Sequence, residues 1–467
     1  MRSISQRSRG LPIIPGVALV ALGLTTAMWS ATAVAQTTTT TPTTTTTSTL
    51  PGTQPGVRSG TPQPTVPGAR STTPSGRTQE LSAREASVLR GPRSDQLDGI
   101  PLGTFVVHPR LAVDLEYDDN IFRTETNRVG DFVFRVRPGV TVDSEWDQHA
   151  LQFYAQAELA RLASNSSESY ESFLVGARGR FDITDELALN GDAEFARIRL
   201  GRGQPGSIGS GFTSVVHQIT TGMSVSYNGD PFYVRFGPRF QRVTYVEGSG
   251  GVNQDYNVFE LGGRLGYKVT PELSVFIDPS YQWVRYDRQI DAFGFSRNSS
   301  GFDIRAGVAY DITRTITAEL GLGYFRRTFS DARLAPVSGL SALARLYWNP
   351  TDQISVELEG RRGVTEYRTA LAGVSSGNAI NTGAQIRIGY LPIDPLLIDA
   401  GFSWQRYDYT SPLSRTDNYY TFDIGAKYYI IPQVFIGPRY IHERRSSSTA
   451  GFNYRDNRYM LTLGGQL

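Results

Sequence analysis

The stretch that decides the fold is Ile304-Arg305-Ala306-Gly307-Val308-Ala309-Tyr310, in which every even-numbered residue is apolar. After a short turn at 311–314 the alternation resumes, with Thr317, Glu319 and glycines on the polar side. Side chains of a strand point to opposite faces with a period of two. Residues 304–325 therefore predict a β-hairpin with one apolar and one polar face. The apolar face of its second half consists of Ile316, Ala318, Leu320, Leu322 and Tyr324.

The same unit recurs from about residue 110 to the last residue. We count about eighteen alternating runs, an even number within the range of bacterial outer-membrane barrels. A single run is a weak signal, but a long series in one register is a strong one. Apolar faces begin, for example, at Leu111, Phe132, Leu151, Phe173, Phe232, Leu273, Ile354 and Leu396.

The connections between these runs alternate in length, as they do in outer-membrane barrels, which have short periplasmic turns and long extracellular loops. The short ones are rich in Asn, Asp, Gly and Pro, the residues of tight turns. They lie at 183–185, 228–231, 269–271, 311–314, 349–352, 392–394 and 431–432. The long ones are polar and lie at 201–212, 246–255, 288–300, 329–338, 368–378, 410–417 and 445–456.

Aromatic residues end the apolar face of strands that run into the short turns. Aromatics also favour strands in general, but that preference does not explain their recurrence at one position. Side chains with an apolar body and a polar tip prefer the membrane interface. We therefore predict a periplasmic aromatic girdle formed by Phe181, Tyr227, Tyr267, Tyr310, Trp348, Tyr390 and Tyr428.

Composition excludes several classes of function. The chain has 467 residues, a formal net charge of +2 and no cysteine. Charge this balanced does not indicate a nucleic-acid partner, and a thiolate metal site or disulfide framework is excluded. The 4 histidines are far apart in the sequence, which disfavours a histidine metal cluster. We predict no cofactor.

The N-terminal part differs from the rest. Its basic start, its apolar run at 11–24 and the small residues Ala33-Val34-Ala35 predict a secretory signal peptide over 1–35. Residues 36–104 are dominated at first by Thr, Pro, Gly and Ser, and predict a disordered periplasmic segment. Residues 79–89 could form a short helix, although a linker is the simpler interpretation. The barrel itself is predicted over 105–467.

The polar face of each strand would line the lumen, and its cations and anions are mixed in similar number. A barrel of this size can enclose an aqueous channel. The simplest interpretation is a salt-bridged wall; the functional one is a conduit for polar material that is uncharged or weakly charged. The predicted lumen-lining residues are Arg135, Arg137, Glu158, Arg178, Arg180, Asp192, Glu194, Arg235, Arg239, Glu260, Arg264, Asp303, Arg305, Glu319, Arg345, Glu357, Glu359, Arg361, Arg387, Asp399, Asp423, Lys427 and Arg439.

Catalytic and metal sites have little support. A hydrolase needs positioned partners, and no local motif marks them. The acids of Asp118-Asp119-Asn120 are possible Ca²⁺ ligands, but no EF-hand spacing follows, so a loop nucleus is favoured. We predict that the protein is not an enzyme and has no metal site.

One motif carries a family resemblance. Tyr117-Asp118-Asp119-Asn120-Ile121-Phe122, followed by Asp131, by Pro138-Gly139-Val140 and by Ser144-Glu145-Trp146 with His149, resembles the start of the putative β-barrel porin type 2 family of outer-membrane proteins. The resemblance covers residues 105–467, and outside this motif it rests on the general pattern of the sequence. It implies an outer-membrane barrel, and it suggests a role in exopolysaccharide export.

The sequence therefore predicts an all-β protein, a transmembrane antiparallel up-and-down β-barrel of the Gram-negative outer membrane. We expect it to pass polar material, either in exopolysaccharide export or by porin-like diffusion. The alternative is a plugged structural or adhesive barrel whose extracellular loops bind partners. The expected partners are outer-membrane lipid, the barrel-assembly machinery, and a polysaccharide chain or small polar solutes.

Overall fold

A computed structural model describes residues 97, 99–203, 213–247, 255–291, 294–366, 369–371, 374–376, 378–410 and 414–467. These residues form one 19-stranded antiparallel sheet and a separate two-stranded sheet. The predicted signal peptide, the possible helix at 79–89 and nearly all of the predicted disordered segment lie outside the described residues.

The strands are long and regular. They are β1 (Ile100–Leu102), β2 (Phe105–Asp118), β3 (Asp131–Ser144), β4 (Ala150–Leu162), β5 (Tyr170–Asp182), β6 (Leu187–Leu200), β7 (Ser214–Asn228), β8 (Phe232–Glu247), β9 (Tyr256–Lys268), β10 (Leu273–Tyr286), β11 (Ser299–Thr313), β12 (Ile316–Phe329), β13 (Val337–Thr351), β14 (Ile354–Thr365), β15 (Thr369–Leu371), β16 (Val374–Ser376), β17 (Ala379–Ile393), β18 (Leu396–Tyr409), β19 (Arg415–Ile431), β20 (Val434–Ser447) and β21 (Tyr454–Gln466). One 3₁₀ turn, η2 (Ser166–Glu168), lies between β4 and β5.

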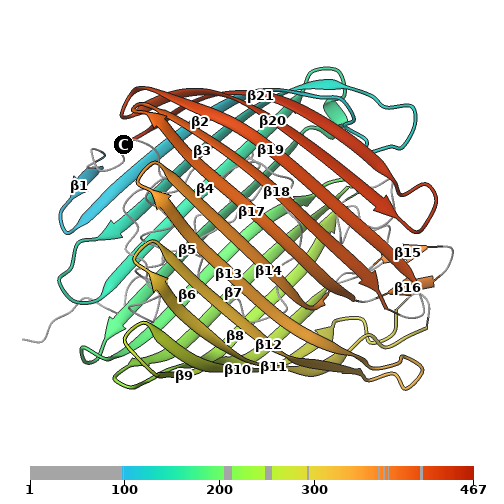
Figure 1. Cartoon of the computed structure of the whole chain (residues 1–467). Coiled ribbons are helices and arrows are strands. Elements are labelled where there is room, and N and C mark those ends of the chain that lie inside the picture. Colours follow the sequence, from blue (N-terminus) through green and yellow to red (C-terminus); the bar gives the residue numbers. More distant parts are fainter. Residues whose placement is uncertain are drawn as a thin grey trace, which may run out of the picture. The chain divides into compact units, whose positions relative to one another are not determined.

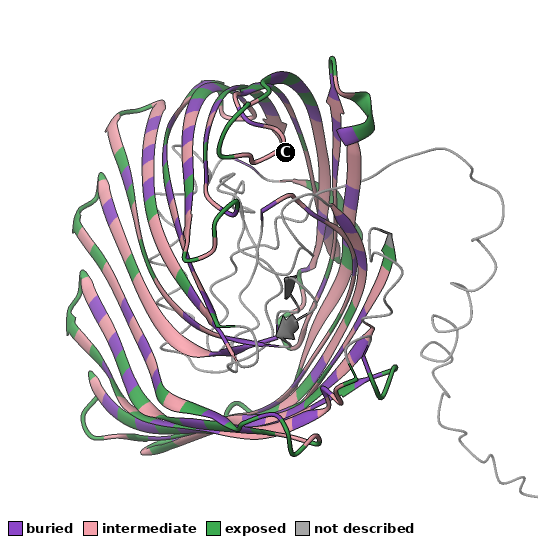
Figure 2. Cartoon of the chain, turned by 90° about the vertical axis from the view of Figure 1, so that its right-hand side faces the viewer, coloured by how far each residue is buried: buried purple, intermediate pink, exposed green. Residues whose placement is uncertain are grey.

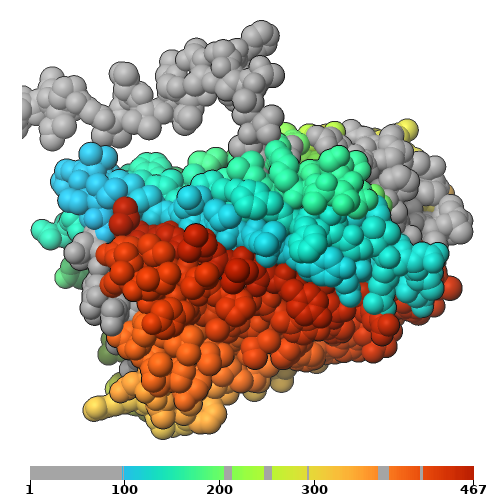
Figure 3. Space-filling model, turned by 90° about the horizontal axis from the view of Figure 1, so that it is seen from above, coloured from blue at the N-terminus to red at the C-terminus, as the bar shows by residue number. Residues whose placement is uncertain are grey.

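The large sheet closes on itself, because β2 pairs with β21 as well as with β3. Strand β1 pairs only with β2, so the closed wall has 19 − 1 = 18 strands. Figure 1 shows these strands winding obliquely around the barrel, and Figure 3 shows the first strands, in blue and cyan, lying beside the red last ones. The prediction of an up-and-down barrel of about eighteen strands is confirmed.

Apolar side chains face outward on this wall. In β12, Leu320, Leu322 and Tyr324 are each about half exposed, whereas Glu319 before them and Phe325 after them are buried. The same alternation appears as stripes along the strands in Figure 2. An apolar residue exposed on one side of a strand, with a buried charge on the other, is the reverse of a water-soluble protein and fits a barrel whose outer surface contacts lipid.

Short and long connections lie at opposite ends of the barrel, as predicted. Some bounds differ from the sequence-based expectation; for example, the predicted turns 349–352 and 392–394 are only 352–353 and 394–395. The turn between β11 and β12 is only 314–315, because the ladder continues past a register shift at Asp311 and Thr313. Strand β1 lies inside the segment for which disorder is predicted, so order begins several residues before 105. Among the described residues, no helix has the length and apolar character needed to cross a membrane.

The predicted girdle aromatics share one place in the hairpins. Tyr310 of β11 lies opposite Leu273, the first residue of β10, and Trp348 of β13 lies opposite Ile316, the first residue of β12. Tyr227, Tyr267, Tyr390 and Tyr428 stand in the same relation to the first residues of β6, β8, β14 and β18. All of them, together with Phe181, have outward side chains that are 40% to 54% exposed.

Candidate functional site

The inner face of the barrel wall is the candidate functional site, because most of the charged side chains of the strands gather there. Every residue of the predicted lumen-lining set occupies the strand face opposite the exposed apolar one. For example, Arg135 and Glu158 are 5% and 3% exposed, while Phe134 beside Arg135 is 50% exposed. Whether any of these residues contacts a passing solute stays a prediction.

The first ion-pair network joins β2, β3, β4 and β5. Arg135 binds both carboxylate oxygens of Glu116, at 2.9 and 3.0 Å, and its Nε lies 2.8 Å from Glu158. The Tyr170 hydroxyl donates to Glu158 at 2.8 Å. Beside this network, Arg137 lies 2.7 Å from Asp114. Buried charges are tolerated when they are paired and hydrogen-bonded. Each charged group here has an ion-pair partner and at least one hydrogen bond, although buried atoms such as Asp114 Oδ2 and Arg137 Nε have no hydrogen-bond partner.

A second network lies on the opposite side of the strand order, across β9, β10 and β12. The Arg264 guanidinium donates to Asp278 at 2.6 and 2.7 Å and to Glu319 at 2.8 Å. It also lies 3.8 Å from the centroid of the Phe276 ring, which adds a cation–π contact. Arg305 and Arg345 approach the same carboxylates at 3.9 Å.

The third network joins β18, β19 and β20. Arg439 donates to Asp399 at 2.6 and 2.7 Å and also to Asp423. All three side chains are less than 10% exposed. In each of these three networks, opposite charges therefore lie within a few ångströms of one another.

A small cavity of about 30 Å³ opens on the inner side of β6 to β9. Asp192, Arg235 and Arg239 bring charge to it, and Ser224 adds a hydroxyl. Arg239 pairs with Asp192 at 3.5 Å. This volume holds water rather than a sugar ring, so the cavity is part of the wall and not a closed ligand pocket.

One end of the lumen is crossed by a short described segment that follows β6. The carbonyl oxygen of Gly203 accepts hydrogen bonds from the Tyr419 hydroxyl at 2.9 Å and from Arg445 at 3.1 Å. These partners belong to β19 and β20, which are not neighbours of β6 in the sheet. Gly203 has φ +73°, and an added Cβ would lie 2.6 Å from Tyr454, so only glycine fits here.

The base of the same segment is held by an acid on η2. Glu168 accepts from Arg199 at 2.7 Å and from Arg202 at 2.6 Å. Burial by itself would raise the pKa of the Glu168 carboxyl, but the hydrogen bonds and charges of Arg202 and Arg199 outweigh it and hold that pKa below its usual value. The carboxylate is therefore ionised at neutral pH and restrains the start of this long loop.

The family motif lies where the barrel closes. Asp119 accepts hydrogen bonds from the backbone N–H of Asn457 at 2.8 Å and from its side-chain amide at 2.6 Å. Asn120 donates to the carbonyl oxygens of Thr124 and Arg455, both at 2.8 Å. Tyr117 packs its ring against Phe132, with 5.1 Å between centroids. Ile121 packs against the cluster of Val133, Ala160 and Leu162, and Phe122 lies under the Arg202 guanidinium.

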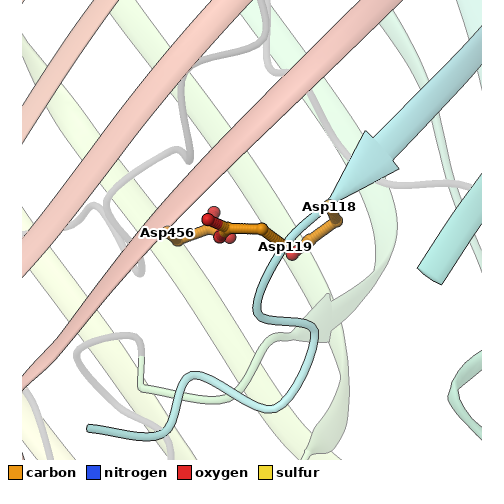
Figure 4. Close-up of side chains that lie close together, drawn as sticks. All are labelled: Asp118, Asp119 and Asp456. Carbon is orange, nitrogen blue, oxygen red and sulfur yellow. The ribbon is translucent and has the colours of Figure 1, made fainter. Parts of the chain in front are cut away.

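Asp118, Asp119 and Asp456 form an acidic group whose ligand atoms all lie within 4.8 Å of one another (Figure 4). Arginines already supply positive charge to it. Arg123 lies 3.0 Å from both Asp118 and Asp456, and Arg458 lies 3.1 Å from Asp456. The geometry therefore favours the loop nucleus predicted from the sequence over a calcium site.

The histidines are dispersed in the fold. His149 stacks on Phe181, with ring centroids 4.3 Å apart, and accepts from the N–H of Asp182. His442 contacts Asn457 at 2.8 Å, His217 contacts Arg197 at 3.2 Å, and His108 lies 3.3 Å from the Leu467 carbonyl. These contacts do not assemble a nucleophile, base and acid.

Several inner-face residues were not predicted as lumen-lining. Asp114 and Glu116 are at most 1% exposed and belong to the first network. Their signal was present, because the outward run of Leu111, Val113 and Leu115 forces the even-numbered residues inward. Asp417 and Arg445 are paired at 2.7 Å near the Gly203 carbonyl. The alternation within a single strand could not predict this site, because Gly203 reaches it from a distant part of the barrel.

One protein family and several solved structures are similar to this chain. The profile of the family described as "Putative beta-barrel porin 2" matches residues 95–467. Similar solved structures include the copper transporter OprC, at 10% identity, with 79% of this chain and 82% of that chain covered and a TM-score of 0.45. OccAB4 of Acinetobacter baumannii has 10% identity, coverage of 77% and 98%, and a TM-score of 0.42. OpdL of Pseudomonas aeruginosa has 13% identity, coverage of 78% and 100%, and a TM-score of 0.41. No curated protein matches the chain.

Proposed function

Since the chain belongs to the putative β-barrel porin 2 family and is an outer-membrane β-barrel, we propose that it passes polar material that is uncharged or weakly charged across the outer membrane. The observation that carries this proposal is the pairing of charges on the inner wall. Arg135, Arg264 and Arg439 each contact two carboxylates. Because the charges are compensated within a few ångströms, the field along the lumen is weak and ions of either sign gain little by entering.

We propose the orientation in which the short turns face the periplasm and the long loops face outward. The ring of outward aromatics beside the short turns supports it, since aromatic girdles lie at membrane interfaces. In this orientation the start of β2 and the end of β21 lie at the periplasmic side. The last strand would then be presented to the assembly machinery there.

Exopolysaccharide export and small-solute diffusion are two forms of this proposal, and they differ in the length of the molecule that passes. An extended sugar chain needs a continuous polar wall with few strong charges to hold it. The matched ion pairs provide such a wall for either form. Export further predicts that neutral oligosaccharides pass with little dependence on chain length, whereas diffusion predicts a steep size limit.

The second candidate is a plugged barrel with structural or adhesive loops. The crossing at Gly203 favours it, because this segment binds Tyr419 and Arg445 on distant strands and so narrows one end of the lumen. A barrel plugged in this way would conduct no ions at any voltage and would expose its long loops as the functional surface.

Planar-bilayer and liposome-swelling measurements on the purified chain separate these candidates. The proposal predicts steady conductance with weak selectivity between K⁺ and Cl⁻, and swelling in neutral sugars. G203A is the matched variant for the second candidate, because its added methyl group cannot fit beside Tyr454. A silent wild type with a conducting G203A would favour the plugged barrel. Silence in both, with native folding verified, would contradict the proposed passage.

A further inference from the structure

Outward-facing arginines gather at one end of the barrel. They lie near the long-loop ends of their strands, on the face that carries apolar residues elsewhere. At the short-turn end, by contrast, the outward positions of the described strands are apolar, aromatic or small. The arginines of this outer belt are Arg161, Arg197, Arg242, Arg285, Arg326, Arg362, Arg406, Arg444 and Arg455.

Several members of the belt are already neutralised or engaged. Arg242 binds Asp287 at 2.5 and 2.7 Å, and Arg406 binds Asp408 at 2.9 and 3.0 Å. Arg285 donates to backbone carbonyls at 2.9 Å. These residues show that an arginine at this level readily takes a partner from the wall when one is within reach.

Arg444 and Arg455 are different, because they face each other. They are directly opposite in the pairing of β20 with β21, and both are exposed. Among the described residues, neither guanidinium forms an ion pair with a carboxylate. Like charges directly opposite on adjacent strands destabilise a sheet. An anion held between them would remove that penalty.

The outward-facing residues of the same two strands, nearer the membrane centre, indicate which anion this pair can reach. Along the outward face of β20 and β21, Pro438 pairs with Leu461, Tyr440 with Tyr459, and then Arg444 with Arg455. The arginines are four residues beyond the tyrosines, about 13 Å along the strand and roughly 10 Å along the membrane normal once the strand tilt is included. If the tyrosines lie at the interface, as such pairs do, the guanidiniums reach the headgroup layer.

The residues between the tyrosine pair and the arginine pair are held by side-chain hydrogen bonds. His442 and the Tyr440 hydroxyl both contact the side-chain oxygen of Asn457 at 2.8 Å. Asn457 is in turn held by Asp119 at 2.6 Å. The backbone that carries Arg444 and Arg455 is therefore fixed on both strands, which lowers the entropy lost when a ligand binds.

We propose that Arg444 and Arg455 bind a phosphate group of the phosphorylated glycolipid of the outer leaflet. Guanidinium groups match phosphate oxygens in charge and geometry, and basic clusters at membrane surfaces recognise anionic lipid headgroups. The proposal rests on the orientation given above, in which the long loops face outward. It does not require the lumen to be open.

The test uses the full chain in detergent micelles and measures retention of lipid A by mass spectrometry. The probes are diphosphoryl lipid A, dephosphorylated lipid A and inorganic phosphate. The variant is R444Q/R455Q, and R406Q is the matched control at the same level, because Arg406 is already paired with Asp408. Wild type should retain diphosphoryl lipid A, and the affinity of R444Q/R455Q for it should be about thirtyfold lower, as expected for two surface arginines. R406Q should behave as wild type, and R444K/R455K should recover most of the binding.

Equal retention of diphosphoryl lipid A by wild type and R444Q/R455Q would overturn the proposal. So would equal retention of the dephosphorylated lipid by wild type, a result that does not depend on any variant folding. If inorganic phosphate at the same concentration displaced lipid A, the site would be one for free anions, and the lipid assignment would be contradicted. Folding of each variant is verified on a gel, where the folded barrel migrates differently from the heated, unfolded chain. A conductance measurement on the same samples is independent, so failure of this proposal and of the proposed passage can be told apart.

Discussion

The carboxylate of Asp119 accepts two hydrogen bonds from Asn457, although 338 residues separate them in the sequence. Asp119 directly follows the first long strand, and Asn457 belongs to the last one. A closed barrel must bring these strands together, and β2 and β21 pair from Arg110 to Asp118. The motif that suggests the family thus has a physical role, because it fastens the seam at the long-loop end.

We expect D119A to weaken this closure. The change removes a charged acceptor and leaves the Asn457 amides without their partner, at a cost of about 2 kcal/mol or more. The midpoint of the heat-induced mobility shift on a gel should fall. D185N, a change in an exposed short turn, is the control and should leave that midpoint in place. A D119A midpoint equal to that of the control would show that the motif does not fasten the seam.

The fold could be predicted because its cause is local. The alternation around Leu320 and the turn residues follow from side-chain direction alone, and repetition gives the strand number. The partners of the inner charges could not be predicted in the same way. Arg264 meets Glu319 although two strands lie between them, and Gly203 meets Tyr419 across the barrel. Such contacts depend on the tilt of the strands and on the closure of the barrel, and the sequence of a single strand indicates neither.

Acid should release the loop that Glu168 holds. Its pKa in the folded protein is lowered, so its contribution is complete above the unfolded value of about 4.3 and is lost as the pH falls through the folded pKa. The protection of residues 199–203 against hydrogen exchange, taken relative to the intrinsic exchange rate at each pH, should therefore fall below about pH 4. In E168Q this protection should already be low at neutral pH and should change little with acid. An identical pH profile in wild type and E168Q would exclude this role.

Removing Arg439 should destabilise the wall more than removing an outward arginine. R439A leaves the buried carboxylates of Asp399 and Asp423 without their partner, which costs about 3–5 kcal/mol. Chemical unfolding in micelles, followed by tryptophan fluorescence, measures the difference. The control R326A changes an exposed side chain and should cost about 0.5 kcal/mol or less. The triple variant R439M/D399N/D423N should regain most of the stability, and equal losses in R439A and R326A would argue against the network.

Trp348 should report the depth of the aromatic ring. It is 41% exposed and faces outward beside a short turn, so we expect it at the lipid interface. In a chain whose other tryptophans are replaced by phenylalanine, lipids brominated near the headgroup should quench its fluorescence more than lipids brominated near the chain end. Quenching by deep bromines alone, or by none, would be inconsistent with a girdle at this position.

Conductance and permeation in the same membrane test the central proposal most directly. The full chain is reconstituted in planar bilayers and in liposomes, and ion current and swelling are measured with neutral and charged sugars of equal size. Matched ion pairs along the wall predict a steady current with little preference between cation and anion, and faster entry of the neutral sugar. A natively folded barrel that carries no current and admits no sugar, or one that selects strongly for one sign of charge, would contradict the account.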